Sequence, residues 1–239
     1  MKLNNKRTIL VGLAFLSICA FWQMYDSIVP LILTKTFHMN ETFSGAIMAA
    51  DNILALFLLP FFGSVSDKSH SKLGKRMPFI LFGTGCAIIL MNILPLLDNS
   101  YAAQPSGFKT ASFVIVLGLL LVAMGTYRAP AVALMPDVTP KPLRSRANAI
   151  INLMGAVGGI LYLGVAAVLY PNSKTAGLDH VNYQPLFIVV SAIMFVAVAV
   201  LFLTIREPKL TAENQALEKQ HPEWNLAQDD GSCLLYTSP

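Results

Sequence analysis

Charged residues are scarce in this chain of 239 residues. Asp, Glu, Lys and Arg together make up 13% of it, against roughly a quarter of a typical soluble domain. Hydrophobic residues make up 55%, so the composition indicates a membrane protein before any motif is considered. The basic residues form neither a polybasic tail nor an aromatic–basic pattern, and we therefore expect no nucleic acid partner.

Cysteine is also rare, and motifs for catalysis or metal binding are missing from the sequence. Cys19, Cys86 and Cys233 stand far apart, which gives neither a disulfide framework nor a metal quartet. The sequence has no H-E-x-x-H motif, no phosphate-binding glycine loop and no nucleophile elbow. We expect no cofactor and no bound metal, and we expect the protein not to be an enzyme.

Six apolar stretches are long enough to cross a bilayer as helices, which takes about 20 residues. In hydrocarbon each backbone amide must be satisfied within its own helix. The predicted fold class is therefore an all-α membrane protein with six transmembrane helices, in which residues 8–205 form the bundle. The predicted spans are Thr8–Thr34, Thr42–Ser64, Pro78–Leu97, Ala111–Pro136, Ala147–Tyr170 and Pro185–Ile205.

Lys and Arg gather in alternate connecting segments of this bundle. One set of ends carries 13 of them and the other only 3. The side with more Lys and Arg is normally cytoplasmic. We therefore expect a cytoplasmic N-terminus (residues 1–7) and a multi-pass protein of the plasma (inner) membrane, with the lipid bilayer as a partner.

The sequence becomes polar after the sixth span. Residues 206–232 are rich in charge, and we interpret them as a cytoplasmic linker. Residues 233–239 change composition abruptly and are a candidate for a non-native tail.

Three ionisable residues fall within the predicted spans: Asp26, Asp51 and Arg128. Such residues are costly in a membrane and usually functional. Trp22 and Gln23 lie about one turn before Asp26 and share its helix face. A carboxylate, an amide and an aromatic ring together suit a sugar, so Asp26 is the first candidate for binding substrate or a proton. The alternative is a carboxyl that only makes local contacts.

Asp51 and Arg128 each leave two interpretations open. Asp51 lies near the middle of the second span, where it could carry a coupling proton or form an ion pair with Arg128. The Arg128 guanidinium could bind a hydroxyl or carboxylate of a substrate, or it could extend towards the interface as an anchor.

A charged loop separates the second span from the third. It reads Gly63-Ser-Val-Ser-Asp67-Lys68-Ser-His-Ser-Lys72-Leu-Gly74-Lys75-Arg76-Met-Pro78. The pattern of a Gly, an Asp–basic pair, and then a Gly with two basic residues resembles the loop between helices 2 and 3 of the major facilitator superfamily. The second part of the loop is similar to that of the sucrose/glycoside–cation symporter branch.

This resemblance implies the N-terminal six-helix half of a transporter whose halves enclose a site at the bilayer midplane. The expected function is proton-coupled sugar or glycoside symport by alternating access. The expected partners are a small-molecule substrate, a proton and the missing C-terminal half, so the chain is expected to be a fragment. Where the melibiose-type branch has acids that serve its cation, this chain has Ala55 and Leu59, which favours protons.

The resemblance also implies a gate on the cytoplasmic side. Asp67 is the only acid among several basic residues of the loop, and we expect it to pair with Arg76, beside Lys75, or with Arg144 or Arg146 after the fourth span. These basic residues also set the orientation of the helices in the membrane, whether or not they form a gate.

Two other functions are open on the sequence alone. One is facilitator-type transport of another solute, such as a drug, a peptide or an organic anion. The other is a half-bundle that does not transport. Competition by sugars would separate the first from sugar symport, and the length of the natural reading frame bears on the second.

Overall fold

The computed structural model describes residues 3–175, 177–178, 180–222 and 224. Within this part, six helices are long and apolar enough to cross a membrane, which confirms the six predicted spans. The helical elements are α1 (Asn5–Leu31), η1 (Ile32–Thr36), α2 (Glu41–Asp67), α3 (Met77–Ala103), α4 (Gly107–Val138), η2 (Lys141–Leu143), α5 (Arg144–Leu169), α6 (Asn172–Thr175), α7 (Gln184–Thr204) and α8 (Glu207–Gln220).

Several spans are longer than their apolar stretches. Helix α3 continues past Leu97, so that Asp98 and Asn99 lie in the helix, beyond the predicted end of the third span. Helix α4 likewise includes Asp137. A helix continues as long as its backbone bonds are made, whereas the hydropathy pattern marks only the part that lies in hydrocarbon.

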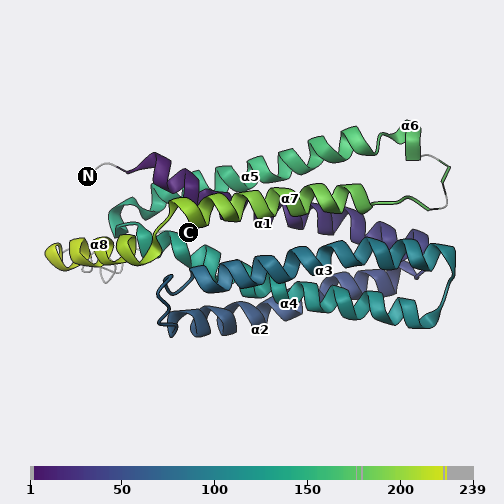
Figure 1. Cartoon of the computed structure of the whole chain (residues 1–239), viewed down its shortest axis with the longest axis horizontal. Helices are drawn as coiled ribbons and strands as arrows, with labels where there is room; N and C mark the ends of the chain where they lie inside the picture. Colours follow the sequence, from purple (N-terminus) through teal and green to yellow (C-terminus); the bar gives the residue numbers. More distant parts are fainter. Residues whose placement is uncertain (1–2, 176, 179, 223, 225–239) are drawn as a thin grey trace, which may run out of the picture.

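The spans run side by side along the long axis of the molecule, as Figure 1 shows. Helix α1 packs on α5 and α7, and α4 packs on α2 and α3, while α3 and α7 close the bundle. Counting only the spans, the first packs on the fifth and sixth, and the fourth packs on the second and third. Spans four to six therefore repeat the packing of spans one to three. Each span runs in the opposite direction to its counterpart three positions earlier, as in transporters with inverted repeats.

Two helix pairs approach each other closely at a glycine. A Cβ on Gly158 of α5 would overlap the Leu16 carbonyl of α1. A Cβ on Gly83 of α3 would lie 2.7 Å from the backbone nitrogen of Tyr127 in α4. Small residues permit such contacts between backbones in membrane bundles. The close approach of the helices in the α1–α5 and α3–α4 pairs thus depends on the absence of a side chain at these two positions.

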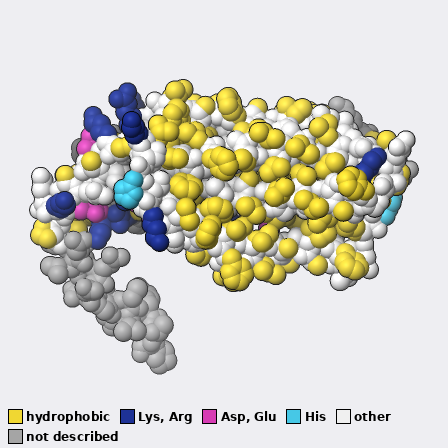
Figure 2. All heavy atoms as spheres, turned by 60° about the horizontal axis from the view of Figure 1, so that its bottom comes forward, with side chains coloured by type: hydrophobic (Ala, Val, Ile, Leu, Met, Phe, Trp, Pro, Cys, Tyr) yellow, Lys and Arg dark blue, Asp and Glu magenta, His cyan; other side chains and the backbone are white. Residues whose placement is uncertain are grey.

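The two ends of the bundle differ in charge. Figure 2 shows hydrophobic side chains over the long middle and most of the visible Lys and Arg at one end. We call this the basic end; it holds the starts of α1, α3 and α5, the ends of α2, α4 and α7, and helix α8. The other is the opposite end.

The segment predicted as a linker contains a helix. Helix α8 covers Glu207–Gln220 and packs on the end of α4. Most of residues 223–232, and the whole tail 233–239, lie outside the described residues.

Candidate functional site

A small cavity lies within the membrane-spanning part, where α1, α2 and α4 meet. Its volume is about 20 Å³, which is room for about one water molecule. Trp22 of α1, Asp51 of α2 and Arg128 of α4 line it among apolar side chains. The Arg128 guanidinium carbon lies 5.5 Å from the centre of the Trp22 ring, a cation–π contact. The fold thus brings together three residues that the sequence singled out separately.

Several buried polar atoms at or beside this cavity have no hydrogen-bond partner among the described residues. The Trp22 Nε1, the Tyr25 hydroxyl and one oxygen of Asp51 are buried, and none makes a hydrogen bond within the described part of the chain. The rings of Trp22 and Tyr25 are 5.3 Å apart. Buried polar atoms are nearly always hydrogen-bonded, so this group is suited to a polar ligand or to water. We call Trp22, Tyr25, Asp51 and Arg128 the polar cluster.

Asp51 and Arg128 share the cavity without forming an ion pair among the described residues. Their charges still act on each other. Of the two interpretations of Asp51, the structural ion pair is therefore not formed in this conformation.

Asp26 and Gln23 lie on the exposed side of α1, next to the polar cluster. The charge of Asp51 acts on Asp26, which places the two acids in one electrostatic neighbourhood. Gln23 faces α5, where its Oε1 would lie 3.8 Å from a Cβ on Gly159. The open face of α1 therefore carries the carboxylate and the amide, whereas the aromatic ring points into the bundle.

Arg128 is positioned through its neighbour Tyr127. The Tyr127 side chain is fully buried, and its hydroxyl lies 2.5 Å from the Ser17 hydroxyl and donates to the Ala14 carbonyl at 3.0 Å. These contacts attach α4 to α1 at this depth. Neither Tyr25 nor Tyr127 was singled out from the sequence, although Tyr25 lies only three positions after Trp22, on the same helix face.

Arg76 is the centre of a second group of charges, at the basic end. It is only 6% exposed. Its Nε donates to Asp137 Oδ2 at 2.8 Å and one terminal nitrogen donates to the Ser66 hydroxyl at 2.5 Å, while the other forms an ion pair with Asp67. Burial alone would lower the pKa of Arg76, but the hydrogen bonds and charges of Asp137 and Asp67 raise it overall. The guanidinium therefore joins the ends of α2, α3 and α4 as a permanent cation.

Glu207 supports the same loop from α8. The residue is 2% exposed, and its carboxylate accepts the backbone N–H groups of Lys75 at 2.7 Å, Arg76 at 2.9 and 3.1 Å, and Met77 at 2.8 Å. These N–H groups have no partner within the helix because they lie at the start of α3. A negative charge at this position also interacts favourably with the helix dipole. The sequence analysis missed this residue, which is more than a hundred positions from its partners.

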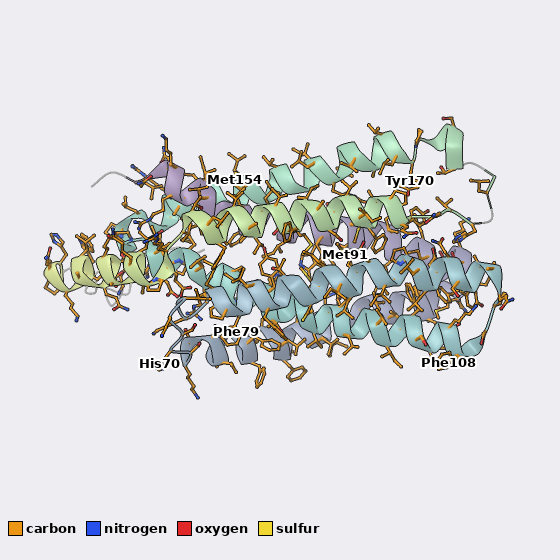
Figure 3. The ribbon with its side chains drawn as sticks, viewed as in Figure 1. His70, Phe79, Met91, Phe108, Met154 and Tyr170 are labelled. Carbon is orange, nitrogen blue, oxygen red and sulfur yellow. The ribbon has the colours of Figure 1, made fainter. Side chains whose placement is uncertain are left out.

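The structure decides between the expected partners of Asp67. The ion pair with Arg76 is confirmed. The alternative, a bond from Asp67 to Arg144 or Arg146, is wrong: Arg144 donates to Glu218 of α8 at 2.9 Å, and the described residues contain no ion pair to the exposed Arg146. Lys75 takes part through its backbone N–H. Figure 3 places His70 on the α2–α3 loop beside this network and Phe79 in the first turn of α3.

The sequence matches the family model described as Major Facilitator Superfamily over residues 11–229. The chain belongs to the Major Facilitator Superfamily. It is 35% identical over 158 residues to the sucrose transport protein SUC3 of Arabidopsis thaliana, a match that covers 61% of this chain and 26% of the relative. It is 36% identical over 154 residues to the sucrose transport protein SUT3 of Oryza sativa subsp. indica, with 59% and 30% covered.

A human protein is also similar. The chain is 25% identical over 186 residues to solute carrier family 45 member 3, which covers 76% of this chain and 34% of the relative. The match therefore spans only about a quarter to a third of the length of each of these relatives. The packing of the first three spans is repeated by the last three, and this arrangement is expected of one half of a transporter of the superfamily.

Proposed function

We propose that this chain is part of a proton-coupled sugar or glycoside symporter that works by alternating access. The observation that carries the proposal is the polar cluster, in which buried hydrogen-bonding atoms of Trp22, Tyr25 and Asp51 have no partner among the described residues. Similarity to proteins named for sucrose transport supports the substrate class. The C-terminal half of a transporter is the expected partner that would complete the site.

The chemistry of these side chains fits a sugar. The Trp22 ring offers a face for the C–H surface of a pyranose, and its Nε1 is a donor. Carboxylates of Asp51 and Asp26 accept hydrogen bonds from hydroxyls, and Arg128 donates. A cavity of about 20 Å³ is too small for a sugar, so the substrate would bind at the exposed face of α1, beside Asp26 and Gln23, and reach towards the polar cluster.

The coupling proton would be held by Asp26 or Asp51. Their charges repel each other, and one proton shared between neighbouring carboxylates relieves that repulsion. Of the two, Asp26 is the more exposed and is therefore the residue that can exchange with the transport path. Proton binding would favour loading from outside.

We further propose that the basic end is cytoplasmic, which puts the N-terminus inside and places the protein in the plasma (inner) membrane. Lys and Arg concentrate at that end, in agreement with the positive-inside rule. Asp67, Lys75, Arg76, Arg144 and Arg146 would then lie at the cytoplasmic gate, with Arg76 as its fixed centre.

The test is uptake by the complete reading frame that contains this chain, expressed in cells that lack sucrose uptake. Asp26→Asn should abolish the uptake of radiolabelled sucrose that an imposed pH gradient drives, because the proton acceptor is lost. Glu41→Gln is the matched control, because Glu41 is an exposed acid at the start of α2. An Asp26→Asn protein with normal uptake and a normal pH profile would contradict proton coupling at this residue.

The substrate class can be tested separately from coupling. In the complete protein, replacing Trp224 and every tryptophan outside this chain by phenylalanine leaves Trp22 as the tryptophan reporter, because this chain contains only these two. Sucrose or an aryl glucoside should change its fluorescence, and Arg128→Lys should weaken binding because the planar guanidinium is lost. Competition by organic anions and none by sugars would favour transport of another solute.

A further inference from the structure

A buried carboxylate outside the polar cluster lies near the end of α3, at the opposite end of the bundle. Asp98 is 0% exposed. It is close to Thr36 of η1 and to His180, which precedes α7, yet neither of its oxygens makes a hydrogen bond of ordinary geometry to a described residue. Thr36 is itself buried. The three residues come from the ends of different spans, at the end of the bundle where Figure 3 labels Tyr170, the residue after α5.

The hydrogen bonds around His180 fix which of its ring nitrogens carries a proton. The backbone N–H of Gln184 donates to Asn182 Oδ1 at 2.9 Å, so this atom is an acceptor. Asn99 Nδ2 therefore donates to the same oxygen at 2.9 Å, which leaves Asn99 Oδ1 facing His180 Nε2 at 2.9 Å. Since that oxygen can only accept, Nε2 is the protonated nitrogen.

The second ring nitrogen leads back to the carboxylate. His180 Nδ1 lies 3.2 Å from the Thr36 hydroxyl. In neutral histidine Nδ1 has no proton and must accept from this hydroxyl, which then cannot donate to Asp98. In protonated histidine Nδ1 donates, and the hydroxyl is free to turn its proton towards Asp98. The protonation of one residue thus controls the hydrogen bond available to the other.

Counting protons shows which state the fold requires. With neutral His180 and ionised Asp98, the buried carboxylate has neither a donor nor a counter-ion among the described residues, which is strongly unfavourable. Adding one proton, to either Asp98 or His180, removes this unpaired buried charge. We propose that Asp98 and His180, linked through the Thr36 hydroxyl, form a proton-binding site at the opposite end of the bundle that takes up one proton as the fold closes around it.

This site would join three spans. In the one-proton state the cluster attaches η1, the end of α3 and the segment before α7. Because the folded cluster binds the proton more tightly than the open one, its stabilising effect is present at low pH and is lost as the pH rises. Removal of the proton requires water to enter and solvate the carboxylate, which separates the three elements.

Other ionisable groups near the cluster do not replace this proton. Burial, and after it the charge of Asp98, raises the pKa of Tyr183, so its phenol stays protonated. Burial also raises the pKa of Tyr170, whose hydroxyl donates to the Asn182 carbonyl at 2.7 Å. Lys109 of α4 donates to the Ser100 and Gln104 carbonyls, and Lys35, beside Thr36, is exposed.

The site can be measured without transport, so that its failure and that of the proposed symport are separate results. The chain has four histidines, and selective ¹⁵N-histidine labelling in lipid nanodiscs gives one pair of ring signals for each. His180→Gln identifies the signals of His180. Where the bundle is closed and His180 is neutral, these signals should show the Nε2–H tautomer. The Nδ1–H tautomer would overturn the proposal.

A second measurement follows thermal stability against pH. In the unmodified chain the melting temperature should fall as the pH rises, because the one-proton cluster is lost. Asp98→Asn, and Thr36→Val, which removes only the hydroxyl, should each make the melting temperature depend less on pH. Glu213→Gln, an exposed acid of α8 at the basic end, is the control and should leave this dependence unchanged. A pH dependence that is the same in the unmodified chain, in Asp98→Asn and in Thr36→Val would overturn the proposal, even if one variant folds poorly.

Discussion

Glu207 accepts the backbone N–H of Arg76 with both of its carboxylate oxygens, at 2.9 and 3.1 Å. The same arginine uses its side chain to bind Asp137 and Asp67. One residue therefore connects α8 through its backbone with the ends of α2 and α4 through its guanidinium. The Glu207 carboxylate binds backbone N–H groups, whereas the Arg76 guanidinium binds two acidic side chains. Each charge can therefore be tested alone.

Removing the charge of Glu207 should destabilise the protein. Glu207→Gln keeps the size of the side chain but replaces one acceptor oxygen by a donor, which then faces backbone N–H groups. Hydrogen bonds to charged groups contribute about 1.5–3 kcal/mol, so we expect a loss of roughly 2 kcal/mol in the free energy of unfolding. Denaturation in micelles measures it. Glu213→Gln is the control, because that side chain is 51% exposed and its two ion-pair distances are both 4.0 Å.

A methyl group at position 74 should have a larger effect than one at position 177. Gly74 has φ +114°, and a Cβ there would overlap the Glu207 carboxylate; Gly177 has φ +80° but open space around it. Gly177→Ala therefore measures backbone strain, of about 1 kcal/mol or more, while Gly74→Ala adds the steric overlap. Combining Gly74→Ala with Glu207→Ala should cost less than the sum of the two changes. Strict additivity in the thermal shifts would argue against this contact.

The two acids that bind Arg76 should contribute unequally. The Asp137 side chain is 29% exposed and the Asp67 side chain 61%. Solvent screens the more exposed pair, which is worth up to about 1 kcal/mol, so Asp67→Asn should have the smaller effect on unfolding. Asp137→Asn should cost about twice as much or more. Equal losses, measured in the same micelles, would show that exposure does not rank these pairs.

The contact between α1 and α5 should not tolerate a side chain at position 158. Gly158→Ala forces the Leu16 carbonyl to move, and overpacking of this kind costs about 1–3 kcal/mol. Gly164→Ala in the same helix meets no atom within 4 Å and should be neutral or slightly stabilising. Thermal melting and gel-filtration profiles of the two variants give the comparison. A stable, monodisperse Gly158→Ala chain would mean that the helices can separate at no cost.

Asp51 should show a trade-off between stability and activity. One of its oxygens is buried without a hydrogen-bond partner among the described residues, so Asp51→Asn removes a charge that Arg128 compensates only in part and should raise the melting temperature by a few degrees. The same change should abolish pH-driven uptake by the complete protein if Asp51 carries the proton. A less stable Asp51→Asn protein would indicate that the charge has a partner after all.

The sequence predicts the spans and their order well, because hydrocarbon imposes one rule on every residue. It also predicts the Asp67–Arg76 pair, whose members are close along the chain. It fails where helices continue beyond their apolar stretches: Asp98, left outside the predicted third span, is a buried residue of α3. Glu207 was missed for another reason. Its partners lie 130 to 132 positions away, and the only local signal is an acid in the first turn of a helix.

Three residues of the polar cluster, Trp22, Asp51 and Arg128, could be named from the sequence, but their arrangement could not be predicted. Asp51 and Arg128 both suit a membrane-embedded site, yet whether they pair depends on how α2 and α4 are rotated about their axes. Hydropathy is nearly uniform around such helices and does not fix that rotation. The buried Tyr127, which attaches α4 to α1, sets it instead.

The glycine contacts at positions 158 and 83 limit how this bundle can change shape. Where one backbone lies against another, neither helix can slide along its partner without lifting out of the contact. Shear between α1 and α5, or between α3 and α4, is thus blocked in the middle of each pair. Any movement that exposes Asp26 first to one face of the membrane and then to the other has to tilt these pairs as stiff blocks.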